Sequence, residues 1–86
     1  MYKIIISHSA EKDLEKLPTQ AVRRIGKVID ELEEDPRPHG SKKLKGANEN
    51  IWRIRVGDYR IIYNIDDVIA IVDIRKVGHR KDIYKR

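Results

Sequence analysis

The sequence predicts an α+β domain in which two N-terminal helices cover one face of a mainly antiparallel four-stranded sheet, in the order β-α-α-β-β-β. Apolar residues in the first forty positions recur at helical spacing, whereas from Ile51 onward they alternate with a period of two. The 86 residues suffice for one domain, taken as residues 1–86. Cysteine is absent, which excludes disulfides and thiolate metal sites, so apolar packing must hold the fold.

The N-terminal half contains one expected strand and two expected helices. Residues 2–7 include three consecutive isoleucines, which are β-branched and favour a strand. Ser7 and Ser9 can each cap a helix over residues 10–17, which Pro18 ends. Thr19 can cap a second helix, ended by two prolines at 36 and 38. Its apolar positions follow helical spacing: Ala21, Val22, Ile25, Val28, Ile29 and Leu32.

The C-terminal half predicts three strands, over residues 51–56, 59–65 and 68–77. Gly57-Asp58 and Asp66-Asp67 supply the two turns between them. This register places one continuous apolar face toward the helices. Its members are Trp52, Ile54, Val56, Tyr59, Ile61, Tyr63, Ile65, Val68, Ala70, Val72 and Ile74.

The opposite face is predicted to carry Arg53, Arg55, Arg60, Asp73 and Arg75. The Gly57-Asp58 turn pairs Arg55 with Arg60, and the second turn places Asp73 opposite Arg60 and Ile71 opposite Ile62. Like charges directly opposite each other destabilise a sheet, so this arrangement has two interpretations. Either Asp73 partly neutralises a solvated structural face, or the arginines are preorganised to bind a polyanion through phosphate.

The excess positive charge lies in two short blocks. The net charge is +5, and residues 41–60 hold six basic and two acidic side chains, while residues 75–86 hold six and one. Clustered positive charge favours nucleic acid, although many small basic proteins bind none. Lys42, Lys43 and Lys45 are expected to rim the arginine face, and the segment containing His79, Arg80 and Lys81 is expected to fold beside it.

Several function classes lack their motifs in this sequence. It contains no glycine-rich phosphate loop, no HExxH and no carboxylates at metal-ligand spacing, so we expect no metal and no cofactor. No apolar run reaches the roughly 18 residues of a membrane span, and the first residues do not form a signal peptide, so we expect a cytoplasmic location. Among the histidines only His79, between Gly78 and Arg80, has a context suited to proton transfer.

Three segments resemble the RelE/ParE toxin superfamily of type II toxin–antitoxin systems, as does the order of elements. They are Leu44-Lys45-Gly46, the stretch from Trp52 through Gly57-Asp58 to Tyr63, and the ending Val77-Gly78-His79-Arg80-Lys81-Asp82-Ile83-Tyr84. Within the superfamily the ending resembles the RelE branch, whose members cut messenger RNA in the ribosomal A site. The resemblance therefore implies a RelE-like, microbial ribonuclease-type fold.

The resemblance also implies a set of catalytic residues and a metal-independent reaction. Arg55, Arg60 and Arg80 would stabilise phosphorane charge, with RNA-binding roles for Lys42, Lys43, Lys45, Arg53, Arg75 and Lys81. The messenger's 2′-OH would attack the adjacent phosphate and leave a 2′,3′-cyclic phosphate and a free 5′-OH. Tyr84 would act as base where cations lower its pKa from about 10, or would instead stack on an RNA base, and His79 is the alternative for proton transfer.

The resemblance implies partners as well. They are the ribosome, messenger RNA and an acidic, RelB-like antitoxin that covers the basic face or displaces the C-terminal segment. Two alternatives to the ribonuclease remain: a ParE-like poison of DNA gyrase on the same fold, and a non-catalytic RNA-binding or inactive homologue.

Overall fold

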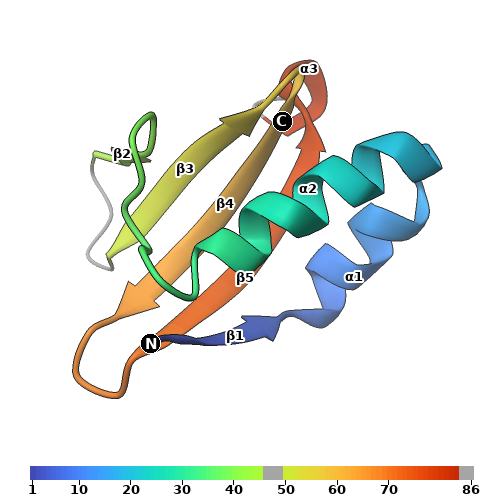
Figure 1. Cartoon of the computed structure of the whole chain (residues 1–86). Helices are drawn as coiled ribbons and strands as arrows, with labels where there is room; N and C mark the ends of the chain where they lie inside the picture. Colours follow the sequence, from blue (N-terminus) through green and yellow to red (C-terminus); the bar gives the residue numbers. More distant parts are fainter. Residues whose placement is uncertain (46–49, 84–86) are drawn as a thin grey trace.

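The computed structural model describes residues 1–45 and 50–83 of the chain. In these residues the chain runs β-α-α-β-β-β-β-α (Figure 1). The elements are β1 (Lys3–Ile6), α1 (His8–Glu15), α2 (Thr19–Glu31), β2 (Lys42–Lys43), β3 (Ile51–Val56), β4 (Tyr59–Asp66), β5 (Ile71–His79) and α3 (Arg80–Ile83). No helix among them is long and apolar enough to cross a membrane.

The five strands form one mixed sheet in the order β1-β5-β4-β3-β2. β1 is parallel to β5, and the other neighbours are antiparallel. The predicted α+β class is therefore confirmed, with one strand more than expected. The additional strand, β2, consists of Lys42 and Lys43, which is too short for any alternation of polar and apolar residues to reveal.

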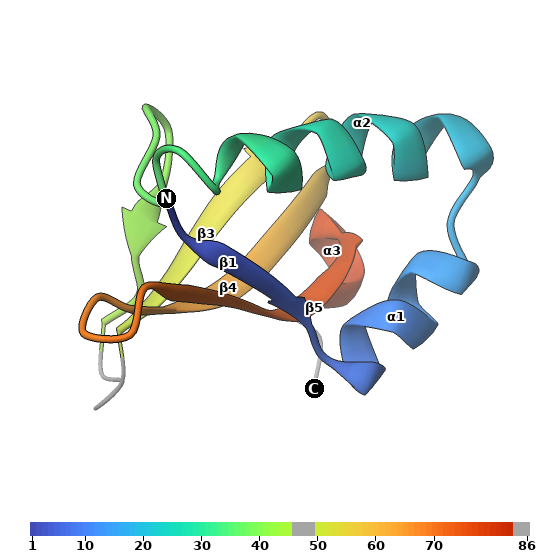
Figure 2. The ribbon, with the colours of Figure 1, turned by 60° about the horizontal axis from the view of Figure 1, so that its bottom comes forward.

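Both predicted N-terminal helices are present on one side of the sheet, with α2 crossing it (Figure 2). Ser7 caps α1, since its Oγ accepts a hydrogen bond from the Ala10 N–H at 3.1 Å. The expected cap of α2 was wrong. Pro18 occupies the N-cap position with extended backbone and no side-chain cap bond, and Thr19 is the first helical residue.

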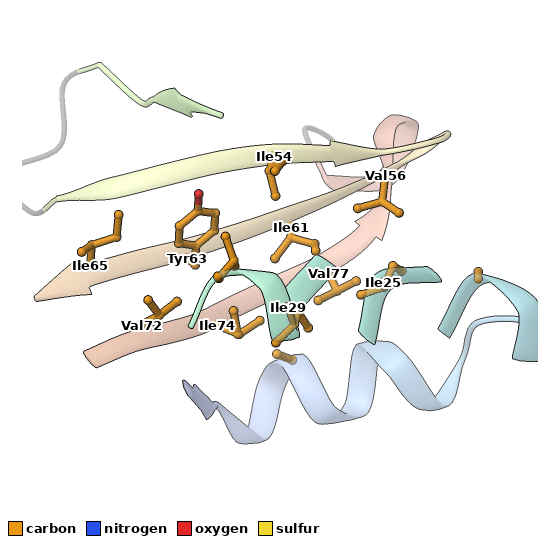
Figure 3. Close-up of a cluster of buried hydrophobic side chains, with 13 residues drawn as sticks. Ile25, Ile29, Ile54, Val56, Ile61, Tyr63, Ile65, Val72, Ile74 and Val77 are labelled. Carbon is orange, nitrogen blue, oxygen red and sulfur yellow. The ribbon is translucent and has the colours of Figure 1, made fainter. Parts of the chain in front are cut away.

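The core lies between α2 and the sheet (Figure 3). Ile25 and Ile29 project from α2 toward side chains of β3, β4 and β5, as the helical spacing predicts. The largest fully buried side chains are Tyr63, Ile25, Leu32, Ile61, Ile65, Ile74 and Val72. Most of the predicted apolar face is thus confirmed, but Val68 is 94% exposed and does not belong to it.

The turn between β4 and β5 lies later than predicted. β4 continues to Asp66, and residues 67–70 form the turn, so Val68 and Ala70 are not strand residues. The Asp66 carboxylate accepts the N–H groups of Val68 and Ile69, and Ala70 adopts a left-handed φ of 55°. The predicted opposition of Arg60 with Asp73 and of Ile62 with Ile71 was therefore wrong; Asn64 faces Asp73 and Asp66 faces Ile71.

A register shift in β5 changes which residues face the core. Ile62 pairs with Lys76 and Tyr63 pairs with Ile74, so Arg75 is an extra residue that the register between β4 and β5 skips. The extra residue reverses the alternation beyond it. Val77 consequently points into the core, where it is 3% exposed, and Gly78 lies on the face away from the helices.

A polar cluster ties the N-terminus, the loop after α2 and the β4–β5 turn together. Both guanidinium NH groups of Arg37 donate to Asp67, at 3.2 and 2.7 Å, and the Tyr2 hydroxyl donates to the same carboxylate at 2.6 Å. Arg37 also lies over the Trp52 ring, 5.3 Å from its centroid. Hydrogen bonds from Arg37 and Tyr2 lower the pKa of Asp67, and the bond to Asp67 raises that of Tyr2.

Candidate functional site

Two arginines stand opposite each other on the sheet face away from the helices. Arg55 of β3 pairs with Arg60 of β4, as predicted, and Arg60 pairs on its other side with Gly78 of β5. The neighbouring residues Ile54, Val56 and Ile61 are core residues, so strand alternation directs both arginines to the other face. Gly78 brings no side chain to this row, so among the described strand residues Arg55 and Arg60 supply its side chains.

Arg60 is the one charged or polar residue among the buried side chains of the described structure, with 5% of its surface exposed. One of its NH groups donates to the carbonyl of Tyr59 at 3.2 Å, but its Nε has no hydrogen-bond partner among the described residues. A buried charge is costly unless it is paired and hydrogen-bonded. A guanidinium held beside a second arginine in this way is suited to an anion supplied from outside the chain.

Asp73 does not neutralise the arginine pair, contrary to one of the two interpretations of the sequence. Its carboxylate accepts the Nε–H of Arg75 at 2.8 Å, and its cross-strand neighbour is Asn64. Because the turn lies later than predicted, Asp73 of β5 faces Asn64 of β4 instead of Arg60. Arg75, expected to bind RNA, is thereby held in an ion pair within its own strand.

The C-terminal helix begins at the turn between β3 and β4. The backbone N–H of Arg80 donates to the carbonyl of Asp58 at 2.8 Å. The first residue of α3 therefore lies next to the turn between the strands of Arg55 and Arg60. Arg80 and Lys81 are both exposed. Figure 1 shows α3 at this end of the sheet, opposite the β4–β5 turn. Tyr84 directly follows α3 in the sequence and lies outside the described residues.

A further arginine, which the sequence analysis missed, reaches this turn from the helical layer. Gly57 has a left-handed φ of 62°, and the Arg24 guanidinium lies 3.1 Å from the position a Cβ would occupy there. Arg24 therefore packs over the turn from α2. Only long-range packing brings α2 to residue 57, so no local sequence signal identified Arg24.

The predicted RNA-binding residues of β2 and β3 lie on two faces. Lys42 pairs with Arg53, and Arg53 with Ile62, which places them on the face of Arg55. Lys43 pairs with Trp52 on the other face. The basic face therefore extends from Arg60 through Arg55 and Arg53 to Lys42. Lys45 is exposed just beyond β2.

His79 lies on the opposite side of the sheet from the arginine row. It pairs with Tyr59, and the two rings meet edge to face with centroids 5.7 Å apart. Its Nδ1 accepts the Lys81 N–H at 3.2 Å. A cavity of about 290 Å³ adjoins it, lined by Asp13, Lys16, Leu17, Val77, Gly78 and His79. The structure thus brings Arg55, Arg60 and the backbone of Arg80 together. His79 lies apart from them, on the other side of the sheet.

No three His, Asp or Glu side chains converge as potential metal ligands within residues 1–45 and 50–83. The described side chains of the arginine row are the two cations Arg55 and Arg60, with the backbone of Arg80 near the turn that joins them. Such an arrangement can bind a phosphodiester and stabilise negative charge that develops on it.

Fold and site together define a class of small α+β proteins that present a cationic strand face beside a short C-terminal helix. Over residues 4–84 the chain matches the family model of the ParE toxin of type II toxin–antitoxin systems, parDE. The chain belongs to this family of toxins, which is part of the RelE/ParE superfamily that the sequence resembles.

Individual relatives agree with this assignment and carry RelE-type names. The chain is 34% identical to toxin RelG of Mycobacterium tuberculosis over 86 residues, covering 99% of this chain and 98% of that protein. It is 35% identical to toxin RelE3 of Methanocaldococcus jannaschii, covering 95% and 94% of the two chains.

Solved structures show the same fold. In the RelE–RelB complex from Pyrococcus horikoshii the matched chain has a TM-score of 0.83 at 32% identity, covering 94% of this chain and 97% of that one. In the intact RelBE complex of E. coli the TM-score is 0.80 at 26% identity, covering 92% and 96%.

Proposed function

We propose that this toxin is a metal-independent endoribonuclease that cleaves messenger RNA in the ribosomal A site and so inhibits translation. The observation that carries the proposal is the arginine row, in which a buried Arg60 with an unpaired Nε stands beside Arg55. No carboxylate in the described part of the chain pairs with either side chain. An RNA phosphate would supply the missing anion and offset the repulsion between the two guanidinium groups.

The reaction uses the nucleophile that RNA itself provides. The 2′-oxygen attacks the adjacent phosphorus while a base removes its proton, and the bond from phosphorus to the 5′-oxygen breaks as that oxygen gains a proton. The products are a 2′,3′-cyclic phosphate and a free 5′-OH. Arg55, Arg60 and Arg80 stabilise the negative charge on the phosphorane oxygens, since their guanidinium groups carry fixed positive charge.

The role of Tyr84 comes from the family resemblance, and the roles of the other residues come from their positions in the structure. Tyr84 is our candidate for proton transfer, and stacking on an RNA base is its other candidate role. His79, the alternative for proton transfer in the sequence analysis, lies on the other side of the sheet from Arg60. Lys42 and Arg53 extend the cationic face and would contact the RNA backbone, joined by Lys45 and Lys81 as exposed cations. Lys43 and Arg75, one on the other face and one ion-paired, would contribute less.

The test is primer extension on translating ribosomes with purified toxin. Wild type should produce cuts in the A-site codon, and Arg60→Ala should slow cleavage by about 10²- to 10³-fold, the usual loss for a group that stabilises transition-state charge. Because Arg60 is buried, its removal could affect folding, so exposed Arg55→Ala is measured in parallel. Arg23→Ala, an exposed arginine of α2, is the matched control and should cleave as wild type does.

Two outcomes would overturn the ribonuclease proposal. One is the absence of A-site cuts by the wild type, and the other is that folded Arg55→Ala and Arg60→Ala cleave like the wild type. The matched family model is that of ParE toxins, so supercoiling by purified DNA gyrase is assayed with the same preparations. Gyrase inhibition without RNA cleavage would favour a gyrase poison, and harmless expression in cells would favour a non-catalytic homologue.

The proposed protein partner is an acidic, RelB-like antitoxin. The basic face and the net charge of +5 favour an acidic ligand, and solved relatives are RelE–RelB complexes. Coexpression with the product of a neighbouring small acidic gene should yield a tight complex that blocks cleavage. Arg55→Ala combined with Arg80→Ala should weaken that complex, whereas Arg23→Ala should not. Failure of the two proteins to copurify would contradict this partner.

A further inference from the structure

His79 occupies the junction between β5 and α3, immediately before the first residue of the helix. Its Nδ1 accepts the N–H of Lys81, two residues further on, at 3.2 Å. This is the bond that an N-cap side chain makes to the second helical residue. The preceding N–H, that of Arg80, donates to Asp58, so the first two orphan donors of α3 both have acceptors.

The surroundings of His79 keep its ring away from the arginine row. Tyr59 contacts it edge to face at 5.7 Å, and both residues lie on the helix side of the sheet, whereas Arg60 and Gly78 lie on the other side. The charged groups facing it from α1 are Asp13 and Lys16, which line the same cavity. Asp13 already accepts the N–H of Val77 at 3.0 Å.

The hydrogen bond from Lys81 determines the chemistry open to His79. Nδ1 must present its lone pair to accept this N–H, so the proton of the neutral ring is on Nε2. Nδ1 is then occupied and cannot take a proton from RNA without releasing Lys81. A helix of only four residues is not stable by itself, so its order depends on anchors of this kind.

We propose that His79 is a positioning residue, which caps α3 and holds Arg80 at the β3–β4 turn without exchanging protons with the substrate. The role deepens the proposed ribonuclease function and rests on it. This role explains why His79, which the sequence suggests as a proton-transfer group, faces away from the arginines in the structure.

The experiment compares three substitutions of His79 in the full chain. Asparagine is a strong N-cap residue but has no ionisable group, whereas alanine and glutamine cap poorly. On translating ribosomes His79→Ala and His79→Gln should cleave about five- to tenfold more slowly than wild type, the loss expected for an N-cap, and His79→Asn should recover most of the rate. His8→Asn, at an exposed histidine of α1, is the control and should cleave normally.

Amide hydrogen exchange at Lys81 provides a readout independent of cleavage. His79→Ala should accelerate exchange there by a similar factor, and His79→Asn should restore the wild-type rate. Equal loss of cleavage in the Asn and Ala variants, or exchange at Lys81 unaffected by His79→Ala, would overturn the positioning role. If wild type does not cleave RNA, the proposed function fails, and the exchange measurement still decides whether His79 caps α3.

Discussion

Arg60 combines a placement that is unfavourable for the stability of the fold with a proposed role in binding phosphate. Arg60 is 5% exposed and stands opposite Arg55. Burial of a charge and the pairing of like charges across two strands both destabilise the fold. The sequence predicted the pair because a two-residue turn fixes its register. It could not predict the burial of Arg60, which results from the packing of distant parts of the chain around it.

Gly57 carries the conformational requirement of that turn. Its φ of 62° is unfavourable for residues with a Cβ, so Gly57→Ala should lower the free energy of unfolding by about 1 kcal/mol. Gly57→Asn should cost less, since asparagine tolerates the left-handed region. Urea denaturation of the three proteins gives these values directly.

A double-mutant cycle separates the backbone conformation of Gly57 from the contact with Arg24. The nearest atoms to a Cβ at residue 57 belong to the end of the flexible Arg24 side chain, which can move aside. Gly57→Ala should therefore be about as destabilising in an Arg24→Ala background as in the wild type. Full rescue by Arg24→Ala would contradict this and show that steric contact dominates.

Among the elements, β5 departs most from what its sequence predicts. The sequence predicts one continuous strand over residues 68–77, but the Asp66 carboxylate accepts the N–H groups of Val68 and Ile69 and turns the chain there. The extra residue Arg75 then changes the direction of every side chain after it. Neither feature follows from the two-residue period, because both depend on hydrogen bonds to partners that the period does not encode.

The helices illustrate the opposite case. The apolar stripe of α2 was predicted almost completely, because burial of one helix face imposes its period on the sequence. The short elements β2 and α3 have two and four residues, which is too few for periodicity. The clustered positive charge and the resemblance to the toxin family, and not a repeating pattern, indicated that the C-terminal segment belongs to the site. The position of His79 on the helix side likewise depends on the β5 register shift.

At the scale of the whole molecule, the sheet separates two polar regions. The arginine row and α3 lie at one end, while Arg37, Asp67 and Tyr2 tie the loops together at the other (Figure 1). Tyr63 lies beneath the second region and donates from its hydroxyl to the Pro36 carbonyl at 2.8 Å. Arg37, Asp67, Tyr2 and Tyr63 are not among the residues proposed to stabilise phosphorane charge or transfer protons, so stability and catalysis can be changed separately.

This separation predicts an alkaline loss of stability that does not involve the site. Burial raises the pKa of Tyr63 to about 12, against an ordinary value of 10.0. Because the folded value is the higher one, the contribution is complete below pH 10 and is lost as pH rises toward 12, where the unfolded chain ionises first. The free energy of unfolding should fall by about 2–3 kcal/mol over this window from Tyr63 alone.

Tyr63→Phe is the control that isolates this group. It removes the ionisable hydroxyl, so urea midpoints should decline less between pH 10 and 12 than those of wild type. At pH 7 it should be less stable by about 1–2 kcal/mol, because the Pro36 carbonyl loses its donor. Arg55→Ala, at the other end of the sheet, should retain the wild-type pH dependence. Parallel declines in wild type and Tyr63→Phe would show that other groups cause the alkaline loss, and that the buried hydroxyl does not couple folding to pH.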